Sequence, residues 1–318
     1  MEFLPSYSPK LQPRLNDNYL TGFDIMSSSI HVDLTGITDL LHCWLSRHVA
    51  SEGLTWLDEK RSQIAGGGTA RVFFTAFSAV PRYTGKKDLE LTLEDWQAAE
   101  VVTGWAPGHW SVEQAARTLL ILALPPDDAE QYLRMLEQLF TTADVGELVA
   151  LYQSLPLLPY PERHLARAAE GIRSNMSVVF NAVALRNPYP NDYFDDLVWN
   201  QMILKAVFVG SPLYLIWGLE RRANSELARM LIDYAHERWA AKRPVTPELW
   251  RLVGPFADAD IIADLEKVLN EPDAAQQEAA ALACSQSPSP QVQALLECRP
   301  DLHALIQEGR LTWNSFSQ

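Results

Sequence analysis

Residues 263–297 read ADLEKVLNEPDAAQQEAAALACSQSPSPQVQALLE, and this stretch indicates the fold class of the chain. Apolar side chains recur in it at helical spacing, and the Pro-Asp and Ser-Pro dipeptides between them are typical of places where helices end. The pattern predicts a helix, a turn, an alanine-rich helix, a second turn and a third helix. The residues expected to form their common core are Leu265, Val268, Leu269, Ala280, Leu282 and Ala283.

Helical periodicity also runs through most of the chain that precedes this stretch, whereas runs of alternating β-branched residues are nearly absent. TLED and SVEQ place Thr92 and Ser111 as helix N-caps, each with an acid or amide in the first turn. We therefore predict an all-α protein. The helices expected before residue 263 include 38–49, 54–64, 93–102, 112–124, 127–140, 145–154, 162–185 and 194–209.

Small residues in the alanine-rich segment would let antiparallel helices pack closely, and here the chain resembles a degenerate HEAT repeat. Stacked helix pairs bury one continuous core without any sheet. We expect a helical-hairpin array, a HEAT-like α-solenoid with no significant β-sheet; the alternative is a single globular helical array. The expected regions are an extended N-terminal arm (1–33), an N-terminal helical region (34–155), a core with an internal polar cluster (156–256) and HEAT-like C-terminal helices (257–318).

The charge balance narrows the possible partners. Among 318 residues the net charge is -14, with 47% hydrophobic and 21% charged residues. Binding to nucleic acid or to an anionic membrane surface needs clustered Lys and Arg, so we expect neither.

The cysteine pattern and the lack of a visible targeting signal predict the cellular compartment of the protein. Cys43, Cys284 and Cys298 are scattered and form no CxxC pair, which predicts reduced thiols in a cytoplasmic protein. No signal peptide is visible at the N-terminus. The longest apolar run is interrupted by Lys205 and by residues 210–212, so it is too short to cross a bilayer and we expect no direct membrane insertion.

The expected helix 194–209 is apolar almost all the way round, yet it carries polar residues. One row along it holds Phe194, Leu197, Gln201, Leu204 and Phe208. The next row holds Val198, Met202, Lys205 and Val209, and no row is polar throughout. We therefore expect Gln201 and Lys205, one turn apart, to project into protein or into a cavity.

A buried ammonium without a partner would cost several kcal/mol, so Lys205 should have an acidic partner or a lowered pKa. Glu170, Asp233 and Glu237 are the expected candidates. Asn175 falls near the apolar seam of the expected helix 162–185, so it should be at least half buried and could join Asn200, Gln201 and Lys205. The two interpretations are a satisfied network that fixes helix register and a ligand pocket between helices.

A second candidate lies in LIDYAHERWAAKR, residues 231–243, where Asp233, His236 and Glu237 share one side of a helix. That spacing suits a metal site, but no second Glu-x-x-His exists to complete one, so we expect no metal and no cofactor. An exposed charged face or a general-acid role for His236 are the alternatives. The full candidate set is Glu170, Arg173, Asn175, Asn200, Gln201, Lys205, Asp233, His236 and Glu237.

Residues 170–256 carry a family resemblance. The segments NPYP, WNQM followed by LKA, RRAN, YAHERWAA and PELWR are similar to the core of the EboA-domain family. That resemblance makes 156–256 an EboA-like core and implies a bacterial protein of secondary-metabolite handling, described as a metabolite traffic protein, in a gene cluster linked to export of a scytonemin precursor. Cluster companions resemble a UbiA-type prenyltransferase, a metal-dependent hydrolase, an isomerase-like barrel and a dehydroquinate-synthase-like enzyme. The resemblance implies no catalytic residues.

Three functions follow as hypotheses. The first is a non-catalytic helical carrier or scaffold that binds a metabolite, or other proteins of the ebo cluster, in a helical groove. The second is an enzyme acting on a cyclic polyol, isoprenoid or aromatic intermediate, with Lys205 and either Glu170 or His236 as the acid-base pair. The third is a protein-protein interaction module, which predicts a buried acidic partner for Lys205 and no cavity beside it. No GxSxG, HExxH or Rossmann glycine motif supports a specific enzyme class.

Overall fold

The computed structural model describes residues 34–316, so the predicted arm 1–33 lies outside the described residues. Within this range the chain forms helices and no β-strand, which confirms the all-α prediction. The α-helices are α1 (Leu34–His48), α2 (Ser51–Ala65), α3 (Ala70–Thr84), α4 (Leu93–Ala99), α5 (Val112–Leu122), α6 (Ala129–Thr142), α7 (Val145–Ser154), α8 (Leu165–Arg173), α9 (Ser177–Ala184), α10 (Tyr189–Tyr193), α11 (Asp196–Val209), α12 (Ser225–Ala240), α13 (Trp250–Val253), α14 (Ile262–Leu269), α15 (Ala274–Gln286), α16 (Pro290–Gln293) and α17 (Pro300–Gln307).

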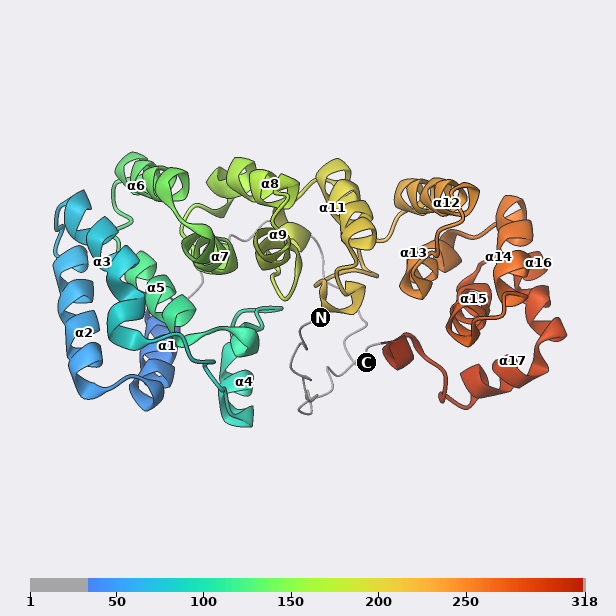
Figure 1. Ribbon diagram of the computed structural model, residues 1–318, viewed down its shortest axis with the longest axis horizontal. Coiled ribbons are helices and arrows are strands. Elements are labelled where there is room, and N and C mark those ends of the chain that lie inside the picture. The colour runs from blue at the N-terminus through green and yellow to red at the C-terminus, as the bar shows by residue number, and fades with distance from the viewer. Residues whose placement is uncertain (1–33, 317–318) are drawn as a thin grey trace, which may run out of the picture.

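The helices progress along the long axis of the molecule broadly in chain order, from α1, α2, α3 and α5 at one end to α14–α17 at the other, while α4 lies nearer the middle (Figure 1). Helices α6, α8, α11 and α12 lie along one edge, with α7, α9, α13 and α15 beneath them. Most packing joins helices close in sequence, such as α8 with α9 and α14 with α15, and the buried side chains form one continuous core. The HEAT-like solenoid itself stays a prediction.

Two helices begin at the N-cap residues that the sequence predicts. Thr92 and Ser111 are the N-caps of α4 and α5, and each accepts a hydrogen bond from a backbone N–H of the first turn. Asp95 and Gln114 bond back to the N-cap amide in both cases, which completes a capping box.

The C-terminal pattern is also confirmed. Helices α14 and α15 occupy the first two predicted segments, and the third is divided between α16 and a 3₁₀ helix, Ala294–Cys298. All six residues predicted to form the core of these helices are buried.

Two expected helices differ from the structure. The single helix 162–185 is wrong, because α8 ends at Arg173 and α9 begins at Ser177. Ser174 is extended, and its hydroxyl accepts from the backbone N–H of Met176, which turns the chain between the helices. The second helix begins at Asp196 rather than at 194, and its apolar surface is not all buried, since Leu197 is 65% exposed and Phe208 69% exposed on α11.

Candidate ligand groove between α9, α11 and α12

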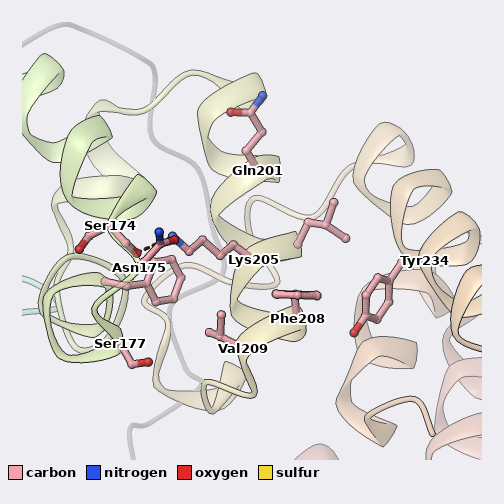
Figure 2. A pocket seen from close by; sticks show the side chains of 10 residues that line it. Ser174, Asn175, Ser177, Gln201, Lys205, Phe208, Val209 and Tyr234 are labelled. Atoms are coloured by element: carbon pink, nitrogen blue, oxygen red, sulfur yellow. Dashed lines mark hydrogen bonds between the residues drawn. The ribbon is translucent and has the colours of Figure 1, made fainter. Parts of the chain in front are cut away.

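A groove of about 560 Å³ opens beside α11, bounded by the α8–α9 link, by α9 and by α12 (Figure 2). Its walls are mostly apolar, and its polar groups are two amides, two serine hydroxyls, one phenol and one ammonium. The lining residues are Ser174, Asn175, Ser177, Phe180, Gln201, Leu204, Lys205, Phe208, Val209 and Tyr234.

Lys205 is half-buried and extends from α11 to the end of α8. Its Nζ donates to the backbone carbonyl oxygens of Ile172 and Ser174, each at 2.7 Å, and lies 5.1 Å from the centre of the Phe180 ring. The last carbonyls of a helix lack intrahelical donors and carry the negative end of the helix dipole, so an ammonium there is favourable. For Lys205 the sequence predicts an acidic partner or a lowered pKa. The acidic partner, from Glu170, Asp233 or Glu237, is wrong, because main-chain oxygens at the break between α8 and α9 accept from the ammonium instead, whereas the lowered pKa is confirmed.

Burial lowers the pKa of Lys205 from its usual value, as expected for an ammonium removed from water without a carboxylate beside it. None of the ten lining residues is acidic, and Lys205 is the one charged residue among them. An ammonium has three N–H donors, and two are taken by the carbonyl oxygens. Among residues 34–316 no further hydrogen-bond acceptor takes the third N–H.

Asn175 and Gln201 line the groove with Lys205, but both are exposed. The expectation that Asn175 is at least half buried is wrong, because it rests on a continuous helix 162–185 and Asn175 lies in the link that interrupts it. In Figure 2 Asn175 lies beside the tip of Lys205, while Gln201 lies further along α11.

Asn200 does not join this group, although it is buried as expected. Its amide bonds in both directions with the amide of Asn224, the N-cap of α12, at 3.2 and 2.9 Å. The predicted cluster of Asn175, Asn200, Gln201 and Lys205 is thus two separate features. One is a polar edge of the groove formed by Asn175, Gln201 and Lys205, and the other is an amide pair that joins α12 to α11.

The remaining predicted residues lie outside the groove lining. Glu170 is exposed and accepts from Arg167 at 2.7 Å, and Arg173 is exposed at the last position of α8. Asp233 and Glu237 are exposed on α12, and His236 is bonded to Asp264 at 2.8 Å. Among residues 34–316 no cluster of three or more His, Cys, Asp or Glu could hold a metal ion.

Sequence reasoning missed two kinds of lining residue: the serines Ser174 and Ser177, and the mostly apolar walls Phe180, Leu204, Phe208, Val209 and Tyr234. The sequence signal that could have located the wall formed by α11 is Gln201. This polar residue lies in the same row of the helix as Leu197 and Phe208, and that row faces solvent.

The fold and groove together define a class: an all-helical protein with an open, largely apolar site of small-molecule size and no recognisable catalytic constellation among the lining residues. A family model described as metabolite traffic protein EboA matches residues 37–254, which include every residue of the groove. The chain belongs to the EboA family. No curated protein and no solved structure matches it. In residues 34–316, no helix combines the length and the apolar character needed to cross a membrane.

Proposed function

We propose that this protein is a non-catalytic helical carrier or scaffold that binds a metabolite in the groove between α9, α11 and α12. The observation that carries the proposal is the groove itself, with one ammonium in a largely apolar wall. Its volume of about 560 Å³ falls in the range that holds one small organic molecule. The family description as a metabolite traffic protein supports the same role. The cargo proposed is a secondary-metabolite precursor, handled in the cytoplasm with other proteins of the cluster.

The enzyme hypothesis gains less support from the groove. Glu170 and His236, the acid-base partners considered for Lys205, do not line it, and each is engaged by another charged side chain. A general acid or base must come within hydrogen-bond reach of the reacting group, so the lining offers Lys205 no titratable carboxylate or imidazole to work with.

The interaction-only hypothesis made two specific predictions about Lys205. It required a buried acidic partner and no cavity beside the side chain. The partners are instead carbonyl oxygens, and the groove lies beside it. These features favour a ligand site over a purely structural charge pair.

The test is native mass spectrometry of the protein purified from its own host, compared with a variant whose groove is filled. Ser177 lines the groove and is exposed, so Ser177→Trp should occupy the space without disturbing the core. We expect a small molecule retained by the unaltered protein, released unchanged on denaturation, and lost from Ser177→Trp. Val178→Trp is the matched control, because Val178 is exposed on the same helix and does not line the groove.

Equal retention by the two tryptophan variants would show that the bound molecule lies elsewhere. Steady conversion of the released molecule by purified protein would overturn the non-catalytic role.

A further inference from the structure

We infer that the ligand of this groove is an apolar, ring-containing molecule with a single anionic oxygen group, a carboxylate, sulfonate or phenolate, which binds at Lys205. The inference rests on the proposed function, since it names the chemical class of the molecule that the groove carries. It follows from the charge of the groove, the geometry of its cation and the nature of its walls.

The charge argument is that Lys205 stands in a lining without any acidic residue, in a protein of net charge -14. Elsewhere an excess of carboxylates repels anions, whereas the partly desolvated groove strengthens attraction to the one cation. The two carbonyl oxygens accept hydrogen bonds from the ammonium but carry no net charge, so no carboxylate of the groove lining neutralises Lys205. An anionic group on the ligand supplies the missing counter-charge through a charge-assisted hydrogen bond from the third N–H.

The wall argument concerns the rest of the ligand. Phe208 leaves 69% of its surface exposed, and Tyr234 of α12 faces it from the other side of the groove (Figure 2). Leu204 and Val209 extend the apolar surface along α11, and Phe180 lies under the tip of Lys205. Aromatic side chains favour flat rings at offset or edge contacts, and covering Phe208 would remove apolar surface from water.

Polar groups at the edges would orient such a molecule. Asn175 and Gln201 can each donate and accept, and the hydroxyl of Ser177 can do the same on α9. A small number of placed polar groups around apolar walls is the usual composition of a small-molecule site. A neutral hydrocarbon would leave the ammonium without its partner, and a ligand with several charges would have to desolvate most of them against apolar walls.

Two fluorescent dyes with the same ring system test the inference. They are 8-anilino-1-naphthalenesulfonate, which is anionic, and N-phenyl-1-naphthylamine, which lacks the sulfonate. Titration of each dye gives its dissociation constant for the unaltered full-length protein and for Lys205→Met, Lys205→Arg, Phe208→Ser and Lys267→Met. Lys267 is an exposed cation on α14, outside the groove, and serves as the matched control for loss of a charge.

We expect Lys205→Met to weaken the anionic dye about ten-fold or more, the loss of one charge-assisted hydrogen bond, and to leave the neutral dye unchanged. Lys205→Arg should keep the anionic dye, Phe208→Ser should weaken both dyes, and Lys267→Met should weaken neither. Because Lys205 also holds the end of α8, retained binding of the neutral dye and the unfolding midpoint show whether Lys205→Met is folded. If Lys205→Met is not folded, titration of both dyes against Lys205→Arg still tests the inference.

Two outcomes overturn different claims. In the first, Phe208→Ser weakens binding of both dyes, but Lys205→Met weakens the anionic dye no more than Lys267→Met does. The groove then binds ligands, and the anionic class is wrong. If Phe208→Ser weakens neither dye, the groove is not the binding site, and the proposed function fails with the inference.

Discussion

The side-chain amides of Asn200 and Asn224 each donate to the other, at 3.2 and 2.9 Å, where the start of α12 meets α11. Asn224 Oδ1 also accepts from the backbone N–H of Leu227, so the same amide caps α12. The two amides that sequence places next to each other on α11, Asn200 and Gln201, therefore have different roles, since Gln201 is exposed at the groove.

Asn200→Ala should lower the free energy of unfolding by about 1–3 kcal/mol, because it leaves the Asn224 amide partly unpaired in a buried contact. Gln201→Ala is the neighbouring control and should change it by less than about 0.5 kcal/mol. Urea denaturation followed by circular dichroism measures both. Equal losses in the two variants would contradict the assignment of the pair to the core and of Gln201 to the groove edge.

Gly254→Ala should destabilise the protein by about 1–3 kcal/mol through overpacking. A Cβ at Gly254 would lie 2.7 Å from the Cα and 2.8 Å from the carbonyl oxygen of Ala283 on α15, and backbone cannot give way as a side chain can. At Gly146 on α7 the nearest atoms would be 3.5 Å or more away, so Gly146→Ala should be neutral or slightly stabilising. Thermal unfolding compares the pair, and a Gly254→Ala midpoint at or above that of Gly146→Ala would refute the close contact.

His109 should make the protein less stable in mild acid. Its Nδ1–H donates to the Ala106 carbonyl, its Nε2 accepts from the Gln153 amide, and burial, helped by the charge of Arg186, lowers its pKa to about 4. The unfolded chain takes up a proton near pH 6.5 and the folded chain only near pH 4. Stability is therefore full above pH 6.5 and falls by at most roughly 3 kcal/mol as pH drops towards 4.

The measurement is the free energy of unfolding at several pH values for the unaltered protein and for His109→Gln, which cannot titrate. We expect the variant to show a shallower loss between pH 6.5 and 4. Parallel curves would show that His109 is protonated equally in both states.

The three thiols should differ in reactivity. Cys43 and Cys298 are exposed, whereas Cys284 is fully buried on α15 and burial raises the pKa of its thiol to about 12. A disulfide reagent such as Ellman's should therefore modify two thiols in the native protein and three after denaturation. Rapid modification of all three without denaturant would mean that the α15 core opens readily.

Much of the fold could be predicted because the signals were local. Capping by Thr92 and Ser111 depends on residues three positions apart, and the C-terminal core depends on spacing within two short helices. The break at Ser174 could not be predicted in this way, because the apolar seam continues through it and nothing in the segment forbids a helix. The break is stabilised from outside by the ammonium of Lys205, more than thirty positions away.

The same limit applies to the groove. Periodicity identified Lys205 as costly to bury, yet it could not distinguish a carboxylate partner from a carbonyl one. It also took the apolar residues of α11 as evidence of burial, although Leu197 and Phe208 are on the exposed side. Which apolar row faces water depends on where α9 and α12 lie, and those positions are set by contacts distant in sequence.

The contact between Gly254 and Ala283 has one more consequence. The family match stops at residue 254, but that glycine is wedged against α15, and Trp250, Leu252 and Val253 just before it are all buried. A fragment trimmed to the matched range would strip the cover from these side chains and present them to solvent. We expect such a fragment to aggregate, because the helices after residue 254 cover the buried end of the matched region.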